Sequence, residues 1–180
     1  MLLVVFGILL GWQPAAHAAD APAGDVEYAV KAAYLYKFAG YVEWPPTSFS
    51  QTTAPLRIGV VGADRLVAEL TRQLAGLSVS NHPVIVAPLK PADALTDVQI
   101  LFIGRQENSG LTRLLAGVRS KPVLTVTERA DGLGEGSVIN FVTTDNRVRF
   151  EISLPAAQES GLKLSSRLLS VAQQVQTVGP

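Results

Sequence analysis

The chain has 180 residues, of which 48% are hydrophobic, and it contains no cysteine. This length suits one domain rather than two, and the hydrophobic content excludes an intrinsically disordered chain. The 15 basic and 15 acidic side chains give a formal net charge of zero. The sequence therefore lacks the excess of lysine and arginine that nucleic-acid binding requires, and without cysteine it excludes thiol redox chemistry and cysteine-ligated zinc.

Residues 1–19 have the features of a signal peptide. Leu2 to Leu10 form an apolar core, and Ala16-His17-Ala18 matches the small-x-small pattern of a cleavage site. No lysine or arginine precedes the apolar core, which leaves the true start codon open. The apolar run is about half of the ~20 residues that a membrane-spanning helix needs. We therefore expect export and a single mature domain over residues 20–180, with an uncleaved membrane anchor as the alternative.

The first predicted element of the mature chain is a helix over Val26–Glu43, capped by Asp25 and ended by Trp44-Pro45-Pro46. Its apolar residues occupy more than one side of the helical wheel, and its charges do not form a separate polar face. We therefore expect more than one side of this helix to be covered. The sheet covers one side, and the C-terminal helix or a second subunit covers another.

The stretch Leu56–Gly62 is predicted to be the central strand, because it is short, almost wholly apolar and closed by a glycine. Runs of this kind are typical of strands buried on both faces of a parallel sheet. A helix over Asp64–Leu74 follows, with Asp64 as its N-cap and Gly76 just beyond its end. Further along, the same alternation predicts strands at 82–87 (broken at Pro88), 98–103 and 122–126, and a helix over 110–118 capped by Ser109.

The last third of the chain predicts a hairpin and a helix. Asp145-Asn146 forms a tight turn between strands at 137–143 and 147–152, and apolar and charged residues alternate along the second strand. We expect this hairpin at an exposed edge of the sheet, followed by a helix with an apolar stripe from Leu164 to Val175. The predicted fold class is α/β: a mainly parallel sheet with helices on both faces, Rossmann-like or flavodoxin-like in its layering, with an antiparallel edge hairpin and a C-terminal helix.

No combination of residues indicates catalysis. His82 is the only histidine after the leader, and neither a nucleophilic serine motif nor a second histidine accompanies it. The glycine-rich segment Asp131–Gly136 leads into a strand, whereas a dinucleotide-binding loop leads into a helix. We therefore expect no enzyme activity, no metal and no cofactor.

A ligand site is predicted at one edge of the sheet. In open parallel sheets, ligands bind beyond the carboxyl ends of the strands. Here that rim includes Asp64, Arg105, Ser109 and Glu128, and Arg105 beside a helix start could hold an anion. The alternative is that these residues form ordinary polar loops, as in any α/β fold.

Two further groups of residues are candidates for binding a protein partner. Tyr36, Tyr41 and Trp44 belong to an aromatic set in and just after the first helix, and tyrosine and tryptophan are enriched in interfaces. The alternating side chains Arg147, Arg149 and Glu151 lie on the exposed face of the hairpin, where a sheet edge is available for pairing. The alternatives are core packing for the aromatic residues and simple solvation for the charged ones.

Particular strings in this sequence resemble the YfiR-like family of bacterial periplasmic proteins. The most specific are Lys31-Ala32-Ala33-Tyr34-Leu35-Tyr36-Lys37-Phe38 and Gly161-Leu162-Lys163-Leu164-Ser165-Ser166-Arg167-Leu168-Leu169. Further strings match in the same order, so that the resemblance covers essentially the whole mature chain: 42–45, 58–62, 100–103, 122–126, 136–140 and 147–152.

The resemblance implies a periplasmic repressor that binds the sensor part of an inner-membrane diguanylate cyclase and keeps the cyclase inactive. It also implies that an outer-membrane OmpA-like lipoprotein sequesters the repressor, and that the repressor forms a homodimer. Release of the cyclase raises cyclic-di-GMP and favours biofilm formation. Some relatives carry disulfide pairs, which this chain lacks. The alternative function, from a different class, is a periplasmic small-molecule binding protein for sensing or import.

Overall fold

The computed structural model describes residues 23–93, 95–107 and 110–178. The predicted signal peptide and Ser109 therefore lie outside the described residues. The helices are α1 (Ala23–Tyr41), η1 (Pro46–Ser48), α2 (Asp64–Leu74), α3 (Leu111–Val118), α4 (Leu154–Glu159) and α5 (Ser166–Ser170). The strands are β1 (Val42–Glu43), β2 (Leu56–Val61), β3 (Ser78–Val79), β4 (His82–Leu89), β5 (Ile100–Ile103), β6 (Leu124–Thr127), β7 (Ile139–Thr144), β8 (Arg147–Ser153), β9 (Lys163–Leu164) and β10 (Gln174–Gln176).

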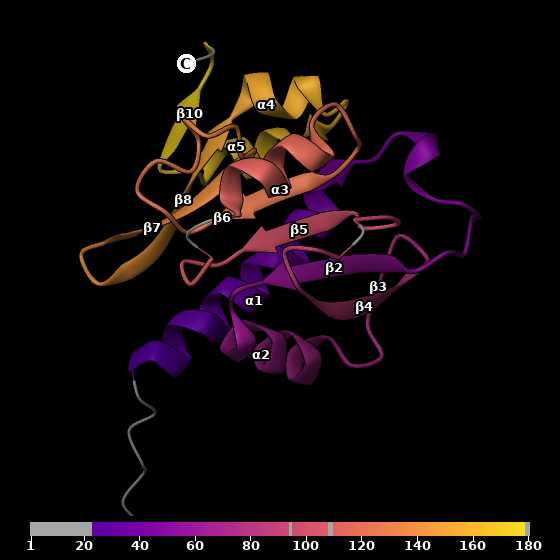
Figure 1. The fold of residues 1–180 in the computed structure, drawn as a ribbon, viewed down its shortest axis with the longest axis horizontal. Coiled ribbons are helices and arrows are strands. Elements are labelled where there is room, and N and C mark those ends of the chain that lie inside the picture. Colours follow the sequence, from indigo (N-terminus) through magenta and orange to yellow (C-terminus); the bar gives the residue numbers. More distant parts are fainter. Residues whose placement is uncertain (1–22, 94, 108–109, 179–180) are drawn as a thin grey trace, which may run out of the picture.

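An eight-stranded mixed sheet forms the centre of the fold, in the order β10-β8-β7-β6-β5-β2-β4-β3 (Figure 1). The strands β4, β2, β5, β6 and β7 are parallel, whereas β8 is antiparallel to β7 and β3 to β4. A separate two-stranded antiparallel sheet joins β1 to β9. The predicted α/β fold class is thus confirmed.

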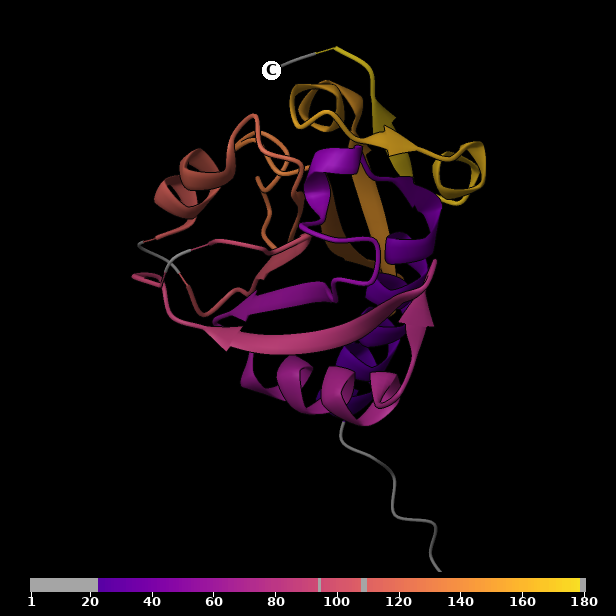
Figure 2. The ribbon, with the colours of Figure 1, turned by 90° about the vertical axis from the view of Figure 1, so that its right-hand side faces the viewer.

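Strand β2 is the central strand that its composition predicted. It pairs in parallel with β4 on one side and β5 on the other, so that Ile58 lies between Val86 and Ile100. Helices cover both faces of the sheet: α1 and α2 pack on one face, and α3 packs on the other. Figure 2 shows α2 and α3 on opposite sides of the strands. Alternate residues of a strand therefore enter different cores, as Phe102 and Leu101 do.

Helix α1 is covered on more than one side, as expected, because it contacts α2, β8 and α5. One stripe nevertheless stays open, in which Val26 is 54% and Val30 37% exposed. Its ends also differ from the prediction. Asp25 lies within the first turn rather than at the cap, and the helix ends at Tyr41 because the next two residues pair with β9.

The hairpin turn is as predicted, with Asp145 and Asn146 at φ of 50° and 55°. Such positive values give the two-residue turn that matches the twist of the strands. The prediction of an exposed edge was wrong for the second half of β8, because β10 pairs in parallel with Glu151–Ser153. The C-terminal helix is correspondingly short. After α5, the backbone N–H of Gln173 donates to the carbonyl of Phe150. The chain then pairs as β10 with the open edge of β8, so the helix does not continue.

Strand β4 continues past Pro88, where the sequence predicted a break. Strand β3 pairs only with His82 and Pro83 at the start of β4, so at Pro88 the strand β4 is the edge of the sheet. Proline has no backbone N–H to donate, and an edge strand tolerates this loss. The other predicted strands and the helix after β5 are present, with bounds shifted by one or two residues. The cap of α2 is Ala63 rather than Asp64, which occupies the first helical position.

A pair of glycine substitutions tests the packing between the ends of β2 and β5. A Cβ atom on Gly104 would lie 2.3 Å from the carbonyl oxygen of Gly62, whereas one on Gly40 in α1 would meet no atom within 4 Å. We expect Gly104→Ala to lower the free energy of unfolding by about 1–3 kcal/mol through overpacking. Gly40→Ala should raise it by about 0.5–1 kcal/mol through helix propensity. Urea unfolding measures both, and equal effects of the two substitutions would contradict the packing.

Candidate functional site

The most unusual side chain in the structure is a buried lysine. Lys31 is followed by Leu35, Phe38 and Val42 at intervals of three or four residues, which places all four on one face of α1 and its continuation. This buried face is turned toward the sheet. Its side chain is only 2% exposed. A lysine is almost never buried to this extent unless its charge is paired. This role was not predicted from the sequence, although the stripe of apolar residues at this spacing marked the buried face.

Two carboxylates pair with the Lys31 ammonium. It donates to Glu27 one turn earlier on α1, and to Glu128, which directly follows β6. The Glu128 side chain is 1% exposed. Its second oxygen accepts a hydrogen bond from the backbone N–H of Arg105 at 2.9 Å. Because Arg105 lies two residues after the end of β5, Glu128 ties α1 to the ends of two parallel strands.

The Arg105 side chain completes the charge cluster, which comprises Glu27, Lys31, Arg105 and Glu128. Its guanidinium donates to Glu27 and, at 3.3 Å, to Glu128. The Lys31 ammonium also lies 5.8 Å from the ring centroid of Phe141 and 5.1 Å from that of Tyr28. Distances of this size allow a cation–π attraction. The cluster is thus held by directional contacts on several sides of Lys31.

The charge cluster shifts the titration of its exposed members. Partial burial alone would raise the pKa of Glu27, but the hydrogen bonds and charges of Lys31 and Arg105 lower this pKa below its ordinary value. For Arg105, burial would lower the pKa, but Glu128 and Glu27 raise it overall. Burial also raises the pKa of Tyr28, and the nearby charge of Glu128 adds to that effect. The shifts of Glu27 and Arg105 favour their charged forms, whereas the shift of Tyr28 favours its neutral phenol.

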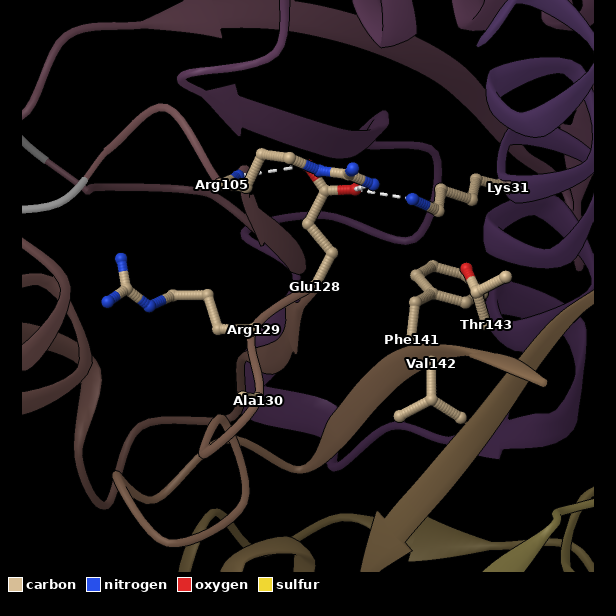
Figure 3. Close-up of a pocket in the computed structure, with 8 residues that line it drawn as sticks. All are labelled: Lys31, Arg105, Glu128, Arg129, Ala130, Phe141, Val142 and Thr143. Carbon is tan, nitrogen blue, oxygen red and sulfur yellow. Dashed lines mark hydrogen bonds and ion pairs between the residues drawn. The ribbon is translucent and has the colours of Figure 1, made fainter. Parts of the chain in front are cut away.

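A pocket of about 310 Å³ opens beside the charge cluster (Figure 3). In Figure 3, Glu128 lies between Arg105 and Lys31, and Phe141 lies on the Lys31 side of the pocket. The pocket is therefore at the carboxyl ends of β5 and β6, next to β7. Its lining residues are Lys31, Arg105, Glu128, Arg129, Ala130, Phe141, Val142 and Thr143.

The predicted rim site is brought together only in part. Arg105 and Glu128 meet in the pocket, but Asp64 is not among its lining residues. The strand order reverses between β2 and β5, where ligands usually bind in this kind of fold. In this protein that crevice is narrow, because Gly104 and Glu107 pack directly on Gly62. The open space lies one strand further along the sheet.

A second hollow surface follows the open stripe of α1. A pocket of about 400 Å³ lies between α1, β8 and α5, and another of about 750 Å³ lies between α1 and the tip of the β7–β8 hairpin. We call these two pockets together the α1 groove. Its lining residues are Val26, Glu27, Val30, Tyr34, Lys37, Phe38, Tyr41, Thr143, Asn146, Arg147, Val148, Phe150, Arg167, Leu168, Ser170 and Val171.

The residues predicted to bind a partner are distributed over separate places. Tyr41 and Arg147 both line the α1 groove. Phe150 points toward α1, because its ring centroid lies 4.9 Å from that of Phe38. Neighbouring residues of a strand point to opposite faces, so Arg149 and Glu151 lie on the face of the hairpin away from α1. Of the predicted hairpin face, Arg147 therefore shares a surface with α1, whereas Arg149 and Glu151 do not line the α1 groove.

Tyr36 and Trp44 make structural contacts elsewhere. The Tyr36 hydroxyl donates to the carbonyl of Ser78 at 3.3 Å. The half-buried Trp44 donates from its indole to the carbonyl of Ala39 at 3.3 Å and packs against Phe49. His82 stacks on the same Phe49 with ring centroids 3.7 Å apart, which agrees with the structural role expected for this histidine.

Two features are absent from residues 23–93, 95–107 and 110–178. No group of three or more histidine, aspartate or glutamate side chains there is arranged to hold a metal ion. No helix in the same part of the chain is long and apolar enough to cross a membrane.

Replacing the buried lysine tests whether the ion pair holds α1 on the sheet. Lys31→Met would leave Glu128 buried without its main countercharge, and we expect a loss of about 3–5 kcal/mol of unfolding free energy. Lys37→Met, on the exposed side of the same helix, is the matched control and should change it by less than about 0.5 kcal/mol. Adding Glu128→Gln to Lys31→Met should restore part of the loss. Equal effects of the two lysine substitutions in denaturant unfolding would refute this role.

The lowered pKa of Glu27 predicts an acid-dependent loss of stability. A folded-state pKa below the ordinary value of 4.5 stabilises the fold above that pH, and this stability is lost as the pH falls through the folded-state pKa. Because Glu27→Gln lacks this carboxylate, its unfolding free energy should fall less between pH 5 and pH 3 than that of the unmodified protein. Glu159→Gln, on the surface at α4, is the control. Parallel pH profiles for the Glu27 variant and the unmodified protein would contradict the prediction.

Comparison with known protein families gives one result that covers most of the chain. The model of the YfiR/HmsC-like family matches residues 28–173. No curated protein matches the sequence. The match includes Lys31, Arg105 and Glu128 and spans every strand up to β9. The proteins of this family are periplasmic regulators connected with diguanylate cyclases rather than known enzymes. The chain thus belongs to the YfiR/HmsC-like family.

Proposed function

We propose that this protein is a periplasmic regulatory protein that binds the periplasmic sensor part of an inner-membrane diguanylate cyclase and holds the cyclase inactive. Such a regulator acts by binding the inactive conformation of the sensor more tightly than the active one. Occupancy of the sensor then lowers cyclic-di-GMP, and loss of occupancy favours biofilm formation. Membership of the YfiR/HmsC-like family supports this function.

The open stripe of α1 is the observation that carries the proposal. Val26 and Val30 are large apolar side chains that are exposed, and they lie beside a groove rather than on a convex surface. Three cationic residues line the α1 groove, Lys37, Arg147 and Arg167, whereas Glu27 is its one acidic residue. The partner segment that fits this groove is therefore apolar with acidic flanks.

Two further parts of the proposal follow from the family resemblance. An outer-membrane OmpA-like lipoprotein would sequester the regulator away from the cyclase. The regulator would act as a homodimer. The lipoprotein and the second copy of the chain would each either compete with the cyclase for the α1 groove or bind at another surface.

Substitution within the groove tests the contact with the cyclase. Val30→Asp should weaken capture of the periplasmic region of a diguanylate cyclase encoded beside this gene by about tenfold or more, because it places an unpaired carboxylate among apolar contacts. Leu77→Asp replaces another exposed apolar residue after α2 and is the matched control. Binding is measured by surface plasmon resonance with the purified sensor region.

A second variant separates the two surfaces that the sequence predicted. Arg149→Glu changes the hairpin face that points away from α1, so the groove contact predicts unchanged capture. Loss of capture by Arg149→Glu but not by Val30→Asp would place the contact on the hairpin instead. If the unmodified protein captures no diguanylate cyclase sensor, the proposed function is wrong.

A further inference from the structure

The side of α1 that lines the α1 groove forms a ridge along most of the helix. Groove-lining residues recur there at intervals of three or four positions: Val26, Val30, Tyr34, Lys37 and Tyr41. This spacing places them in one row along the helix axis, which is about 22 Å long at about 1.5 Å per residue. Rows of this kind are the ridges that fit into the grooves of a second helix.

The opposite wall of the groove offers little backbone to an extended partner segment. Strand β8 contributes Arg147, Val148 and Phe150 to that wall. Its backbone is paired with β7 from Arg147 to Ile152 and with β10 at Glu151–Ser153. A partner strand could therefore extend the sheet only along the first residues of β8. A helix needs side-chain contacts alone, because its backbone hydrogen bonds are internal, so the groove favours a helix.

The cations of the groove lack countercharges within the described part of the chain. Among the described residues, no hydrogen bond or ion pair engages the side chain of Lys37, Arg147 or Arg167, and all three side chains are exposed. Glu27 does not compensate them, because its carboxylate is already bound by the two cations of the charge cluster. Acidic side chains of a partner would therefore complement the groove.

The same charges argue against a second copy of this chain as the occupant of the groove. Arg147 lies in the half around Val30, and Lys37 and Arg167 lie in the half around Tyr41. A twofold axis across α1 would bring Arg147 of each copy toward Lys37 and Arg167 of the other. A twofold axis along α1 would bring each cation toward its own equivalent. Both arrangements place like charges together, so a different, acidic chain fits better.

We propose that the α1 groove binds an amphipathic helix of the cyclase sensor, which packs along α1 with its apolar residues on Val26 and Val30. Acidic residues about two turns apart on this helix meet Arg147 at one end of the groove and Lys37 and Arg167 at the other. This inference rests on the proposed function, because it takes the α1 groove as the contact with the cyclase. It adds the conformation and the charge pattern of the segment that binds there.

A crosslinking scan along α1 tests the conformation of the bound segment. A photoreactive phenylalanine analogue replaces Val26, Val30, Lys37 or Tyr41 in separate variants, and each variant is expressed with the full-length cyclase. Mass spectrometry then locates the crosslinked cyclase residues. A helix beside α1 spans the distance from position 26 to position 41 with about 15 residues, whereas an extended strand spans it with about 7. We expect crosslinks in one cyclase segment, displaced by about 15 residues between the first and the last variant.

Charge reversal tests the acidic residues of the bound helix. The double variant Lys37→Glu/Arg167→Glu should weaken capture of the purified sensor region at least about tenfold in surface plasmon resonance, because it places acidic side chains against acidic ones. Arg113→Glu is the matched control and should leave capture unchanged, since Arg113 is an exposed arginine on α3, on the other face of the sheet. Thermal unfolding of each variant checks that it is folded.

Several results would overturn the inference and leave the proposed function standing. They are cyclase crosslinks that span only about 7 residues or that scatter over separate segments, and equal capture by the double variant and Arg113→Glu. Crosslinks from α1 to a second copy of this chain, with the sensor still captured, would also overturn it. A different result contradicts the proposed function itself: no crosslink to the cyclase from any position, together with no capture of the sensor by the unmodified protein.

Discussion

The buried ion pair between Lys31 and Glu128 is the interaction on which the rest of the structure depends. It joins α1 to the residue that directly follows β6, across 97 positions of sequence. Both side chains are almost fully buried, so neither charge can be solvated if its partner is lost. The same carboxylate accepts from the backbone of Arg105 after β5. One buried acid thereby sets the position of α1 relative to the parallel strands.

This position of α1 determines both surfaces that are available for binding. With Lys31, Leu35 and Phe38 turned toward the sheet, Val26 and Val30 are necessarily turned outward, where they border the α1 groove. On the sheet side, the same lysine forms part of the wall of the small pocket. Glu27 belongs to both places, since it lines the groove and binds Lys31 and Arg105. The groove and the pocket are therefore connected by a single carboxylate.

Local sequence patterns predicted most of the fold, and long-range pairing accounts for most of the differences. The apolar run of β2, the spacing of α2 and the Asp145-Asn146 turn each reflect constraints within a few residues, and each is present. The C-terminal helix is shorter than its apolar stripe predicted, because Gln174–Gln176 pair with a strand more than 20 positions earlier. No periodicity within the C-terminal segment contains that information.

The candidate site shows the same division between local and distant information. The rule for parallel sheets correctly placed Arg105 and Glu128 at one rim, but Asp64 is not among the residues that line the pocket. Lys31 was overlooked because its partner Glu128 is distant in sequence, although its place in the apolar stripe of α1 was visible. Aromatic composition did not indicate that the half-buried Trp44 bonds to the carbonyl of Ala39 and packs on Phe49, and its role in binding a partner stays a prediction.

Site-specific photocrosslinking is the most direct test of the claim that this protein works by holding a cyclase sensor in the α1 groove. A photoreactive phenylalanine analogue replaces Val30 in one variant and Leu77 in another, and each variant is expressed with the cyclase. The contact predicts a covalent product with the periplasmic region of the cyclase from position 30 and none from position 77. Crosslinking from position 77 alone, or equally from both positions, would contradict it.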